Sequence, residues 1–379
     1  MKLGVVCDYL EEGWLSMDIC AQMLSERMSN LTDVDIQPVQ IRPSFQWRLK
    51  YLQAYIPKSF NSDRFINRFI DYPRYLKSQA ADYDLFHIAD HSYAHLVHSL
   101  PAATTGVFCH DLNAFESLLE PQKYPRGWSY RRMSTQILTG LQQAAIVFHT
   151  THEIRQQIER YQLVDPAKLV AAPLGVAPAY HPQPLPADPT IIHLQARLQG
   201  RPFILHVGSC IPRKRVDVLL DIFAQLRTEL PELLLVKVGG EWSQSQQQQI
   251  ANLGLAKSIV HLTNLQDTTI AQLYQQAQIV MVTSQSEGFG MPVVEALACG
   301  AIVLASDIPV LREVGGDAVC YCPMGDIEAW CTQSRSAIFH PEAFAPSMAQ
   351  RLARAACYSW DNHARIVAEA YARLGAGQF

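Results

Sequence analysis

Short apolar runs recur along the chain, and each is followed by a stretch in which apolar residues have helical spacing. The runs are "LGVVC", "DLFHIA", "TGVFCH" and "AAIVFHT" in the first half, then "PFILHVG", "LLLVKVGG", "IVHLT", "IVMVTS" and "AIVLAS" in the second. Near-continuous Val, Ile and Leu runs that alternate with helices are typical of parallel sheets covered on both faces. The pattern therefore predicts an α/β protein with two doubly wound domains.

A proline-rich stretch, "PLGVAPAYHPQPLPADP", separates the two series of runs, and its six prolines interrupt every periodic pattern over residues 173–189. The 379 residues of the chain are enough for two separate cores. We therefore expect an N-terminal domain over 1–180, a linker over 181–200, a C-terminal domain over 201–355 and a terminal helix within 356–379.

Composition narrows the class of protein. With 49% hydrophobic residues, 17% charged residues and a net charge of −4, no general attraction to nucleic acid is expected. The start of the chain has too short an apolar run for a signal peptide, and no stretch of about 18 apolar residues predicts a membrane span. Nine cysteines without a CxxC pair favour reduced thiols in a cytosol. Cys320 and Cys322 are expected at alternate positions of one strand.

A glycine-bounded turn with two acids follows the buried run "IVMVT". In "SEGFGMPVVEALACG", residues 286–300, Gly288 and Gly290 allow a ligand to approach the backbone closely. If a helix begins near Met291, the amides at its start favour an anion, and a diphosphate is the natural candidate.

The two acids of this stretch are expected to have different partners. Glu295 lies one helical turn beyond the start of the helix, within reach of vicinal hydroxyls such as those of a ribose. Glu287, held in the turn, faces whatever is attached beyond the phosphates.

A second strand, turn and helix occurs at residues 206–223, "HVGSCIPRKRVDVLLDIF", with Arg213, Lys214 and Arg215 at the start of the helix. A run of basic residues is most often a solvated surface. At the carboxyl end of a buried strand, however, basic side chains and helix amides suit a diphosphate leaving group.

These residues, in this order, resemble glycosyltransferase family 4 of the GT-B fold. The most specific motif is E-x7-E, from Glu287 to Glu295, and "VGSCIPRKR" matches the diphosphate-binding turn of the family. Further matches are "CHDL", "THEIRQQI", "PLGV" and "SWDNHARIV". The resemblance covers the whole chain, more strongly in its second half.

The resemblance implies two Rossmann-like domains that face a central cleft, with a C-terminal helix that crosses back to the N-terminal domain. It also implies retaining transfer of a hexose from a UDP- or GDP-sugar to an acceptor, with no cofactor and no bound metal. The implied catalytic residues are His110, Arg213, Lys214 and Glu287. The implied donor-binding residues are Gly208, Arg213, Lys214, Glu287, Phe289, Gly290, Met291 and Glu295.

On the N-terminal side, the family's equivalent of His110 contacts the donor sugar. The family usually has two adjacent glycines in its first loop, whereas "EEGWLSMD" has only Gly13, followed by Trp14. This departure puts the acceptor contact in doubt. Trp14 is expected either to stack on a sugar or lipid or to pack within the domain.

Further polar residues follow other strands of the N-terminal domain. Asp90, His91 and Asp111 are expected to line the acceptor side. His91 and His95 would share a face of a helix and could bind a metal together with His87, but no HExxH motif or cysteine supports such a site. His95 and His98 are otherwise expected to be scaffold.

Residues 42–78 mix basic and aromatic side chains. The basic residues are Arg42, Arg48, Lys50, Lys58, Arg64, Arg68, Arg74 and Lys77, and the aromatic ones are Phe45, Trp47, Tyr51, Tyr55, Phe60, Phe65, Phe69, Tyr72 and Tyr75. One interpretation is helices that pack their aromatic side chains into the core. The other is a surface that touches anionic lipid, which predicts a cytoplasmic protein, peripheral on the membrane, with a lipid or lipid-linked acceptor.

Other functions stay open from the residues alone. A sugar-nucleotide epimerase or phosphorylase on the same scaffold is one alternative, and a non-catalytic sugar-nucleotide-binding protein is another. No GxGxxG follows the first strand and no GKS or GKT occurs, which disfavours a dinucleotide dehydrogenase and a P-loop kinase. Nucleic acid is not an expected partner, because no recognised nucleic-acid module accompanies the basic residues.

Overall fold

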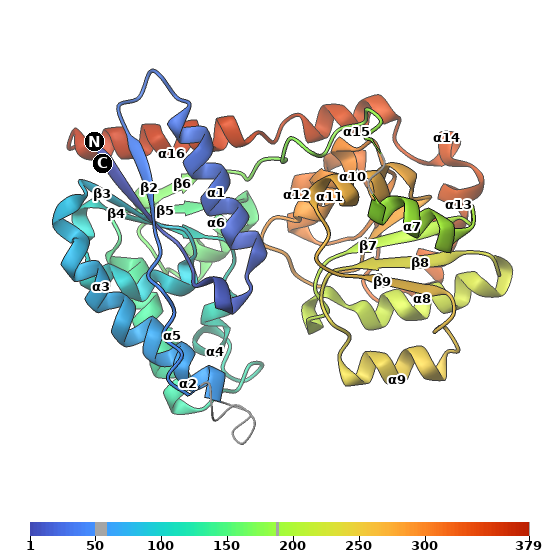
Figure 1. Cartoon of the computed structure of the whole chain (residues 1–379), viewed down its shortest axis with the longest axis horizontal. Coiled ribbons are helices and arrows are strands. Elements are labelled where there is room, and N and C mark those ends of the chain that lie inside the picture. The colour runs from blue at the N-terminus through green and yellow to red at the C-terminus, as the bar shows by residue number, and fades with distance from the viewer. Residues whose placement is uncertain (50–58, 187–188, 379) are drawn as a thin grey trace. The chain divides into compact units, whose positions relative to one another are not determined.

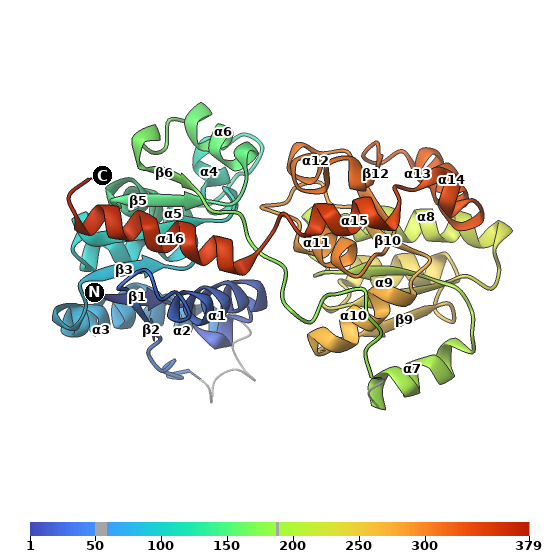
Figure 2. The same ribbon diagram turned by 90° about the horizontal axis from the view of Figure 1, so that it is seen from above.

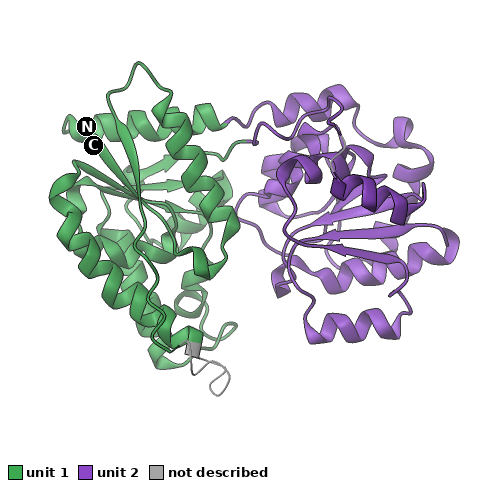
Figure 3. Cartoon of the chain, in the orientation of Figure 1, with its two compact units in different colours: residues 1–175, 360–379 green, residues 176–359 purple. Residues whose placement is uncertain are grey.

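The chain forms two compact units, each with its own sheet and its own apolar core (Figure 3). Unit 1 comprises Met1–Gly175 and Trp360–Phe379, and unit 2 comprises Val176–Ser359. The structure is a computed structural model, and it describes residues 1–49, 59–186 and 189–378.

Unit 1 is built on a parallel sheet in the order β2-β1-β3-β4-β5-β6 (Figure 1). Its strands are β1 (Lys2–Val6), β2 (Gln37–Ile41), β3 (Leu85–Ile88), β4 (Thr105–Cys109), β5 (Ile146–His149) and β6 (Leu169–Ala171). The order reverses between β1 and β3, because β2 lies on one side of β1 and all later strands lie on the other. Ligands of open α/β sheets bind at the carboxyl ends of the strands at such a reversal.

Helices connect and cover these strands. They are α1 (Leu15–Ser29), α2 (Ser59–Ile66), α3 (Tyr72–Gln79), α4 (Glu116–Leu119), α5 (Trp128–Gln143), α6 (His152–Arg160) and α16 (Trp360–Gly375). Helix α16, red in Figure 2, contacts α1, and the hydroxyl of its Tyr371 donates to the carbonyl of Phe86 in β3 at 2.8 Å. The expectation that the C-terminal helix belongs with the N-terminal fold is confirmed.

Unit 2 repeats the architecture, with strand order β12-β11-β10-β7-β8-β9 and all pairs parallel. The strands are β7 (Phe203–Val207), β8 (Leu234–Val238), β9 (Ile259–Leu262), β10 (Ile279–Val282), β11 (Val303–Ser306) and β12 (Cys320–Cys322). Here the order reverses between β7 and β10. The two motifs singled out in the sequence follow these two strands, so the topology brings them to one edge of the sheet.

The helices of unit 2 lie on both faces of its sheet (Figure 2). They are α7 (Pro189–Leu198), α8 (Val216–Glu229), α9 (Gln244–Asn252), α10 (Asp267–Gln276), α11 (Met291–Ala298), α12 (Pro309–Gly315), α13 (Ile327–Phe339), α14 (Pro341–Phe344) and α15 (Met348–Ala355). Within the part of the chain that the structure describes, no helix combines the length and the apolar character needed to cross a bilayer.

The segment expected to be a linker, 181–200, contains helix α7. Ile191, Leu194 and Leu198 of this helix are buried in the core of unit 2. Pro189, interpreted from the sequence as part of a break, is instead the first residue of the helix, where a missing N–H is tolerated.

Candidate active site

A cluster of charged and polar side chains in unit 2 is centred on Glu287, in the turn after β10. Its Oε1 accepts from the Lys214 ammonium at 2.5 Å and from the Ser284 hydroxyl at 2.6 Å. Its Oε2 accepts from the Arg213 guanidinium at 3.1 Å, and Arg213 also donates to the Ser286 carbonyl at 3.0 Å. The sequence predicted these residues at one edge of the sheet, but not that Glu287 would bind both cations directly.

The two cations of this cluster stabilise the ionised form of Glu287. Burial alone would raise the pKa of Glu287, but Lys214 and Arg213 outweigh burial and lower it, so Glu287 is a carboxylate at neutral pH. The side chain of Glu287 is only 5% exposed, whereas those of Lys214 and Arg213 are 12% and 29% exposed. The two cations therefore keep access to an anionic ligand.

Backbone contacts explain why the basic turn meets the end of β10. The Gln285 N–H donates to the Arg213 carbonyl at 2.7 Å, and the Thr283 hydroxyl donates to the Lys214 carbonyl at 3.0 Å. Arg215, which caps α8 with a left-handed backbone (φ 48°), binds Asp217 instead of Glu287. Only the first two basic residues of "RKR" thus join the cluster.

Helix α11 starts beside this cluster. Gly290 caps it with φ 95°, and a Cβ at this position would come within 2.7 Å of the Leu311 side chain, so glycine is required there. Phe289 is buried against Tyr358, with 5.2 Å between ring centroids. Met291 is the first residue of the helix, as the sequence predicted, and the first amides of a helix are donors for an anion.

Glu295 lies one turn into α11 and accepts from the Tyr274 hydroxyl at 3.0 Å. Burial raises the pKa of Glu295 to about 7. The two glutamates of the E-x7-E motif therefore differ in their surroundings: Glu287 has two cationic partners, whereas Glu295 has a neutral hydroxyl.

In unit 1, the predicted acceptor-side residues contact one another at the ends of β3 and β4. His91 Nδ1 lies 3.2 Å from Asp90 Oδ1, and His91 Nε2 lies 3.4 Å from Asp111 Oδ1. Burial alone would lower the pKa of His91, but Asp111 and Asp90 raise it to about 10, which favours the imidazolium form at neutral pH. The same pairing holds the pKa of Asp90 far below its usual range, against the effect of burial.

His110 is buried beside this group. Its Nε2 lies 2.8 Å from the Ala89 carbonyl, so this nitrogen carries the proton and donates. Burial lowers the pKa of His110, which makes the neutral ring the form at pH 7. The nitrogen left to accept from a ligand is therefore Nδ1.

Asp8 belongs to the same edge, and sequence reasoning missed it. It follows β1, is 3% exposed, and has no hydrogen-bond partner for either carboxylate oxygen among the described residues. Burial and the neighbouring Asp90 carboxylate raise its pKa well above the usual range. An acidic residue directly after the first buried strand was the available signal.

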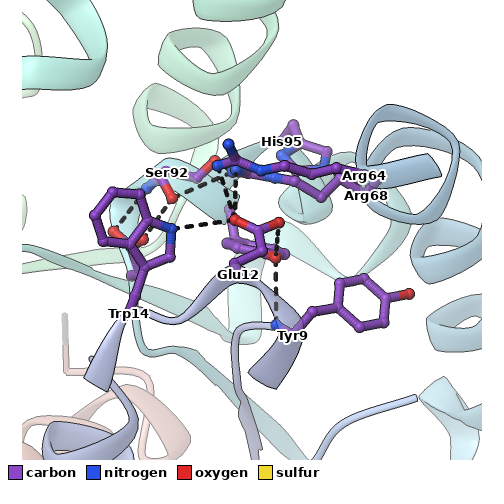
Figure 4. A network of polar contacts seen from close by, with 9 residues as sticks. Tyr9, Glu12, Trp14, Arg64, Arg68, Ser92 and His95 are labelled. Atoms are coloured by element: carbon purple, nitrogen blue, oxygen red, sulfur yellow. Dashed lines mark hydrogen bonds and ion pairs between the residues drawn. The ribbon is translucent and has the colours of Figure 1, made fainter. Parts of the chain in front are cut away.

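Glu12 organises the loop after β1 (Figure 4). Its carboxylate binds Arg64 at 2.8 Å and Arg68 at 3.3 Å, and accepts from the Trp14 indole at 3.2 Å and the Tyr93 hydroxyl at 2.7 Å. Glu12 was not selected from the sequence, because its partners are 2 to 81 residues away.

Gly13 and Trp14 end this loop. Gly13 has φ 70° and closes the 3-10 turn at Leu10–Glu12, so its backbone conformation accounts for glycine there. Trp14 is 45% exposed, although its indole N–H is bound to Glu12. The ring is not part of the core of unit 1, which leaves it accessible.

The structure also divides the basic and aromatic segment at 42–78. Phe45 and Tyr72 are buried in the core of unit 1, and Arg68 is 7% exposed. The core-packing interpretation therefore holds for these residues. The exposed members among the described residues are Trp47, Arg48, Phe65, Arg74, Tyr75 and Lys77. Lys50, Tyr51, Tyr55 and Lys58 lie outside the described residues.

The histidines considered for a metal site have other partners. His87 Nδ1 lies 3.0 Å from the Tyr371 hydroxyl, His95 Nε2 lies 2.8 Å from the Arg68 carbonyl, and His98 contacts side chains and backbone of α5. Across the described ranges, no group of three or more His, Cys, Asp or Glu residues has an arrangement that could hold a metal ion.

Comparison with known protein sequences adds independent information. Residues 190–354 match the family model described as "Glycosyl transferases group 1". The chain is 26% identical over 284 residues to the O-antigen chain mannosyltransferase B of Escherichia coli, a match that covers 74% of this chain and 72% of the relative. It is 27% identical over 241 residues to the D-inositol 3-phosphate glycosyltransferase of Gordonia bronchialis, covering 60% of this chain and 52% of the relative.

Solved structures share the fold over nearly the whole chain. Sucrose-phosphate synthase of Thermosynechococcus elongatus superposes with a TM-score of 0.73 at 18% identity, covering 100% of both chains. HepE of Anabaena, in complex with UDP and glucose, gives a TM-score of 0.74 at 16% identity and covers 98% of this chain and 99% of its own. The family match, the relatives and the two parallel sheets show a glycosyltransferase with the GT-B fold that is similar, over residues 190–354, to the glycosyl transferases of group 1.

Proposed function

We propose that the protein transfers mannose from a nucleoside diphosphate sugar to a growing glycan chain. The observation that carries the donor half of the proposal is Glu287, bound to Lys214 and Arg213 beside the start of α11. Mannose and a glycan acceptor are suggested by the names of two E. coli relatives, an O-antigen chain mannosyltransferase and a serotype-specific mannosyltransferase. The match to the second covers 36% of that protein, so only part of its activity is comparable.

In this proposal the two cations neutralise the leaving diphosphate. Arg213 and Lys214 are held in place before the reaction by Glu287 and by the backbone of β10, so little reorganisation is needed when negative charge develops. Gly208 and the amides of Phe289, Gly290 and Met291 contact the phosphates and the sugar. Glu287 accepts from hydroxyls of the donor sugar, and Glu295 accepts from the ribose.

The carboxyl ends of β1, β3 and β4 supply the acceptor side. His110 offers Nδ1 to a sugar hydroxyl, because its Nε2 is bound to the Ala89 carbonyl. Asp90, His91 and Asp111 form a charged group next to it, and Gly13 and Trp14 present an exposed aromatic ring on which a sugar could stack.

A panel of nucleotide sugars tests the donor. GDP-mannose, UDP-glucose and UDP-N-acetylglucosamine are compared for the rise in melting temperature that each causes, because a ligand bound only by the folded state stabilises it. The stabilising donor is then incubated with mannose-terminated oligosaccharides, and the anomeric configuration of the product is read by NMR. Donor turnover without acceptor would indicate an epimerase or phosphorylase, and binding without turnover would indicate a non-catalytic protein.

A lipid-linked acceptor at a membrane surface is a second proposal, supported by the exposed residues of the 42–78 segment. Arg74, Tyr75 and Lys77 are exposed on α3, and Phe65 is exposed on α2. Each basic residue near an anionic surface contributes about 1 kcal/mol. Co-sedimentation with anionic and neutral vesicles would compare the wild type with Arg74→Gln/Lys77→Gln, and Arg197→Gln/Lys257→Gln in unit 2 is the control with the same change in charge. Equal, negligible sedimentation with both vesicle types would reject membrane docking.

A further inference from the structure

Lys237 is a fully buried lysine in β8, where every other residue of the strand is apolar. Its side chain is 0% exposed, and among the described residues no carboxylate lies within ion-pair distance of its ammonium. An unpaired buried charge is costly, and natural proteins rarely keep one without compensation. The contacts of this ammonium therefore need an explanation.

The ammonium is surrounded by backbone carbonyls. It donates to the Gly208 carbonyl at 2.7 Å, to the Val238 carbonyl at 3.3 Å and, at closer range, to the Gly239 carbonyl. It also lies over the ring of Trp242, 5.6 Å from the centroid. Gly208 belongs to the turn after β7, so Lys237 joins the turns that follow two neighbouring strands.

The position of Lys237 is next to the donor site proposed above. β7 and β8 pair in parallel with His206 opposite Lys237, and β7 is one of the two strands at which the order of the sheet reverses. The turn that Lys237 holds leads directly into Arg213 and Lys214. Lys237 therefore lies beneath the backbone that carries the cationic turn.

The two turns are packed backbone against backbone. A Cβ added at Gly240 would lie 2.6 Å from the Cys210 amide nitrogen and 2.8 Å from the Ser209 Cα. By comparison, a Cβ at Gly208 would make an ordinary contact of 3.5 Å with His206 Nε2. The two turns therefore approach each other most closely at Gly240. The Gln246 side chain also donates a hydrogen bond of 3.1 Å to the Cys210 carbonyl.

Because the peptide bond is planar, the carbonyl contacts of Lys237 also fix the direction of the neighbouring N–H groups. In a trans peptide the carbonyl and the following N–H point in opposite directions. When Lys237 holds the carbonyls of Gly208 and Gly239, the N–H groups of Ser209 and Gly240 are turned away from it and from the core beneath. Amides oriented in this way form an anion-binding concavity.

We propose that Lys237 is a positioning residue for the diphosphate subsite: it orients the Ser209 and Gly240 amides toward the phosphates and supplies a buried positive charge beneath them. The inference rests on the proposed donor site in unit 2. In this proposal Lys237 does not contact the ligand, but it fixes the conformation of the backbone turns that do.

A purely structural role predicts a different result from a positioning role. A structural defect weakens all ligands of the unit alike, whereas a misplaced diphosphate turn weakens only ligands that carry the second phosphate. The test therefore compares the dissociation constants of UDP with UMP, and of GDP with GMP, by calorimetry, using the pair that the wild type binds.

The variants are Lys237→Met, which removes the charge and the donors, and Lys237→Gln, which keeps an amide donor without charge. Lys257→Met, an exposed lysine of the same unit, is the matched control. We expect Lys237→Met to weaken the nucleoside diphosphate by roughly 10- to 100-fold, as for loss of charge-assisted hydrogen bonds, with the monophosphate changed less than about threefold. Lys237→Gln should fall between, and Lys257→Met should match the wild type.

The outcomes separate this inference from the proposed function. If the wild type binds no nucleoside diphosphate more tightly than its monophosphate, the proposed donor site is wrong. If the wild type prefers the diphosphate and a folded Lys237→Met or Lys237→Gln keeps the same preference, the donor site stands and the role of Lys237 is rejected. Circular dichroism and the melting temperature establish folding, and Lys237→Gln is decisive if Lys237→Met does not fold.

Discussion

Both units gather acidic side chains at the point where the strand order of a parallel sheet reverses, but Glu287 in unit 2 and Asp8 in unit 1 have opposite electrostatic surroundings. In unit 2, Lys214 and Arg213 lower the pKa of Glu287 against the effect of burial. In unit 1, burial and the Asp90 carboxylate raise the pKa of Asp8. The comparison teaches that strand order decides where polar groups gather, whereas the neighbours supplied by other segments decide which charge they carry.

The cations of the two units differ in how far they are exposed to solvent. Arg68 in unit 1 has an 8% exposed side chain and binds Glu12, which is 0% exposed, inside a closed network (Figure 4). Arg213 in unit 2 is 29% exposed and borders the start of α11. Breaking the first set should chiefly cost stability, and breaking the second should chiefly cost catalysis.

The largest expected effect is that of Glu12→Ala on stability. The change leaves Arg64 and Arg68 without their carboxylate, and breaking a buried ion pair typically costs about 3–5 kcal/mol. Urea denaturation monitored by circular dichroism gives the free energy of unfolding. Glu26→Ala, which removes an exposed acid of α1, should change it by less than about 0.5 kcal/mol. A Glu12 variant as stable as the Glu26 variant would show that the network adds little.

Glu287→Ala and Lys214→Ala should each lower transfer activity with the fold intact. Loss of one preorganised charge contact typically removes about 2–4 kcal/mol of transition-state stabilisation, or roughly 30- to 1000-fold in rate. Steady-state transfer with the stabilising donor measures the effect. Arg335→Ala removes a cation of the same unit that binds Glu229, and it should stay near wild type. Near-wild-type turnover in both site variants would refute the assignment.

Glu295→Ala should chiefly weaken the nucleotide. The loss of hydrogen bonds from ribose hydroxyls to this carboxylate is expected to cost about 1.5–3 kcal/mol, or roughly 10- to 150-fold in the dissociation constant. Calorimetry with the nucleoside diphosphate measures it. Tyr274→Phe, which removes only the hydroxyl that donates to Glu295 at 3.0 Å, is a matched comparison and should have a smaller effect. Unchanged affinity in Glu295→Ala would remove the ribose role.

The interaction of His91 with Asp90 and Asp111 in unit 1 should make the stability of the protein depend on pH. The pKa of His91 is about 10 in the folded protein, because Asp111 and Asp90 outweigh burial, and about 6.5 in an unfolded chain. Its contribution is therefore full below pH 6.5 and decreases as the pH rises toward 10. Melting temperatures of the wild type and His91→Gln from pH 6 to about 9.5 should converge as the pH rises. A constant difference would contradict the imidazolium assignment.

The smallest expected effect is that of chelation. Because Arg213 and Lys214 balance the diphosphate, we expect transfer activity to survive EDTA, which an assay with and without added Mg²⁺ or Mn²⁺ would check. A complete loss of activity that metal restores would contradict this, and would return attention to His87, Asp90, His91 and His95.

The sequence pattern predicted much of the fold. All nine apolar runs form strands, the helix after "SEGFG" begins at Met291, and Cys320 and Cys322 share a strand. It did not reveal β2 and β6, which are short and expose residues. Edge strands carry polar residues because one side meets solvent, so they lack the apolar run that marks a central strand.

For the candidate site, the sequence predicted the residues but not their partners. Glu287, Lys214 and Arg213 were recognisable because each follows a buried strand within a short motif. Glu12 and Lys237 were not, because Glu12 depends on Arg64 and Arg68, and Lys237 stands alone in an apolar run. A buried charge can be recognised only when the groups that surround it are known.

Local information in the chain, namely periodicity, glycine positions and motif order, was therefore sufficient for the fold class, for the resemblance to a glycosyltransferase family and for a hypothesis about where the donor binds. The tertiary structure alone decided that Glu287 binds both cations, that Arg68 is buried, and that the Asp8 carboxylate is buried beside Asp90. The physical reason is that periodicity acts between neighbours in sequence, whereas charge and desolvation act between neighbours in space, and packing brings together residues that are tens of positions apart.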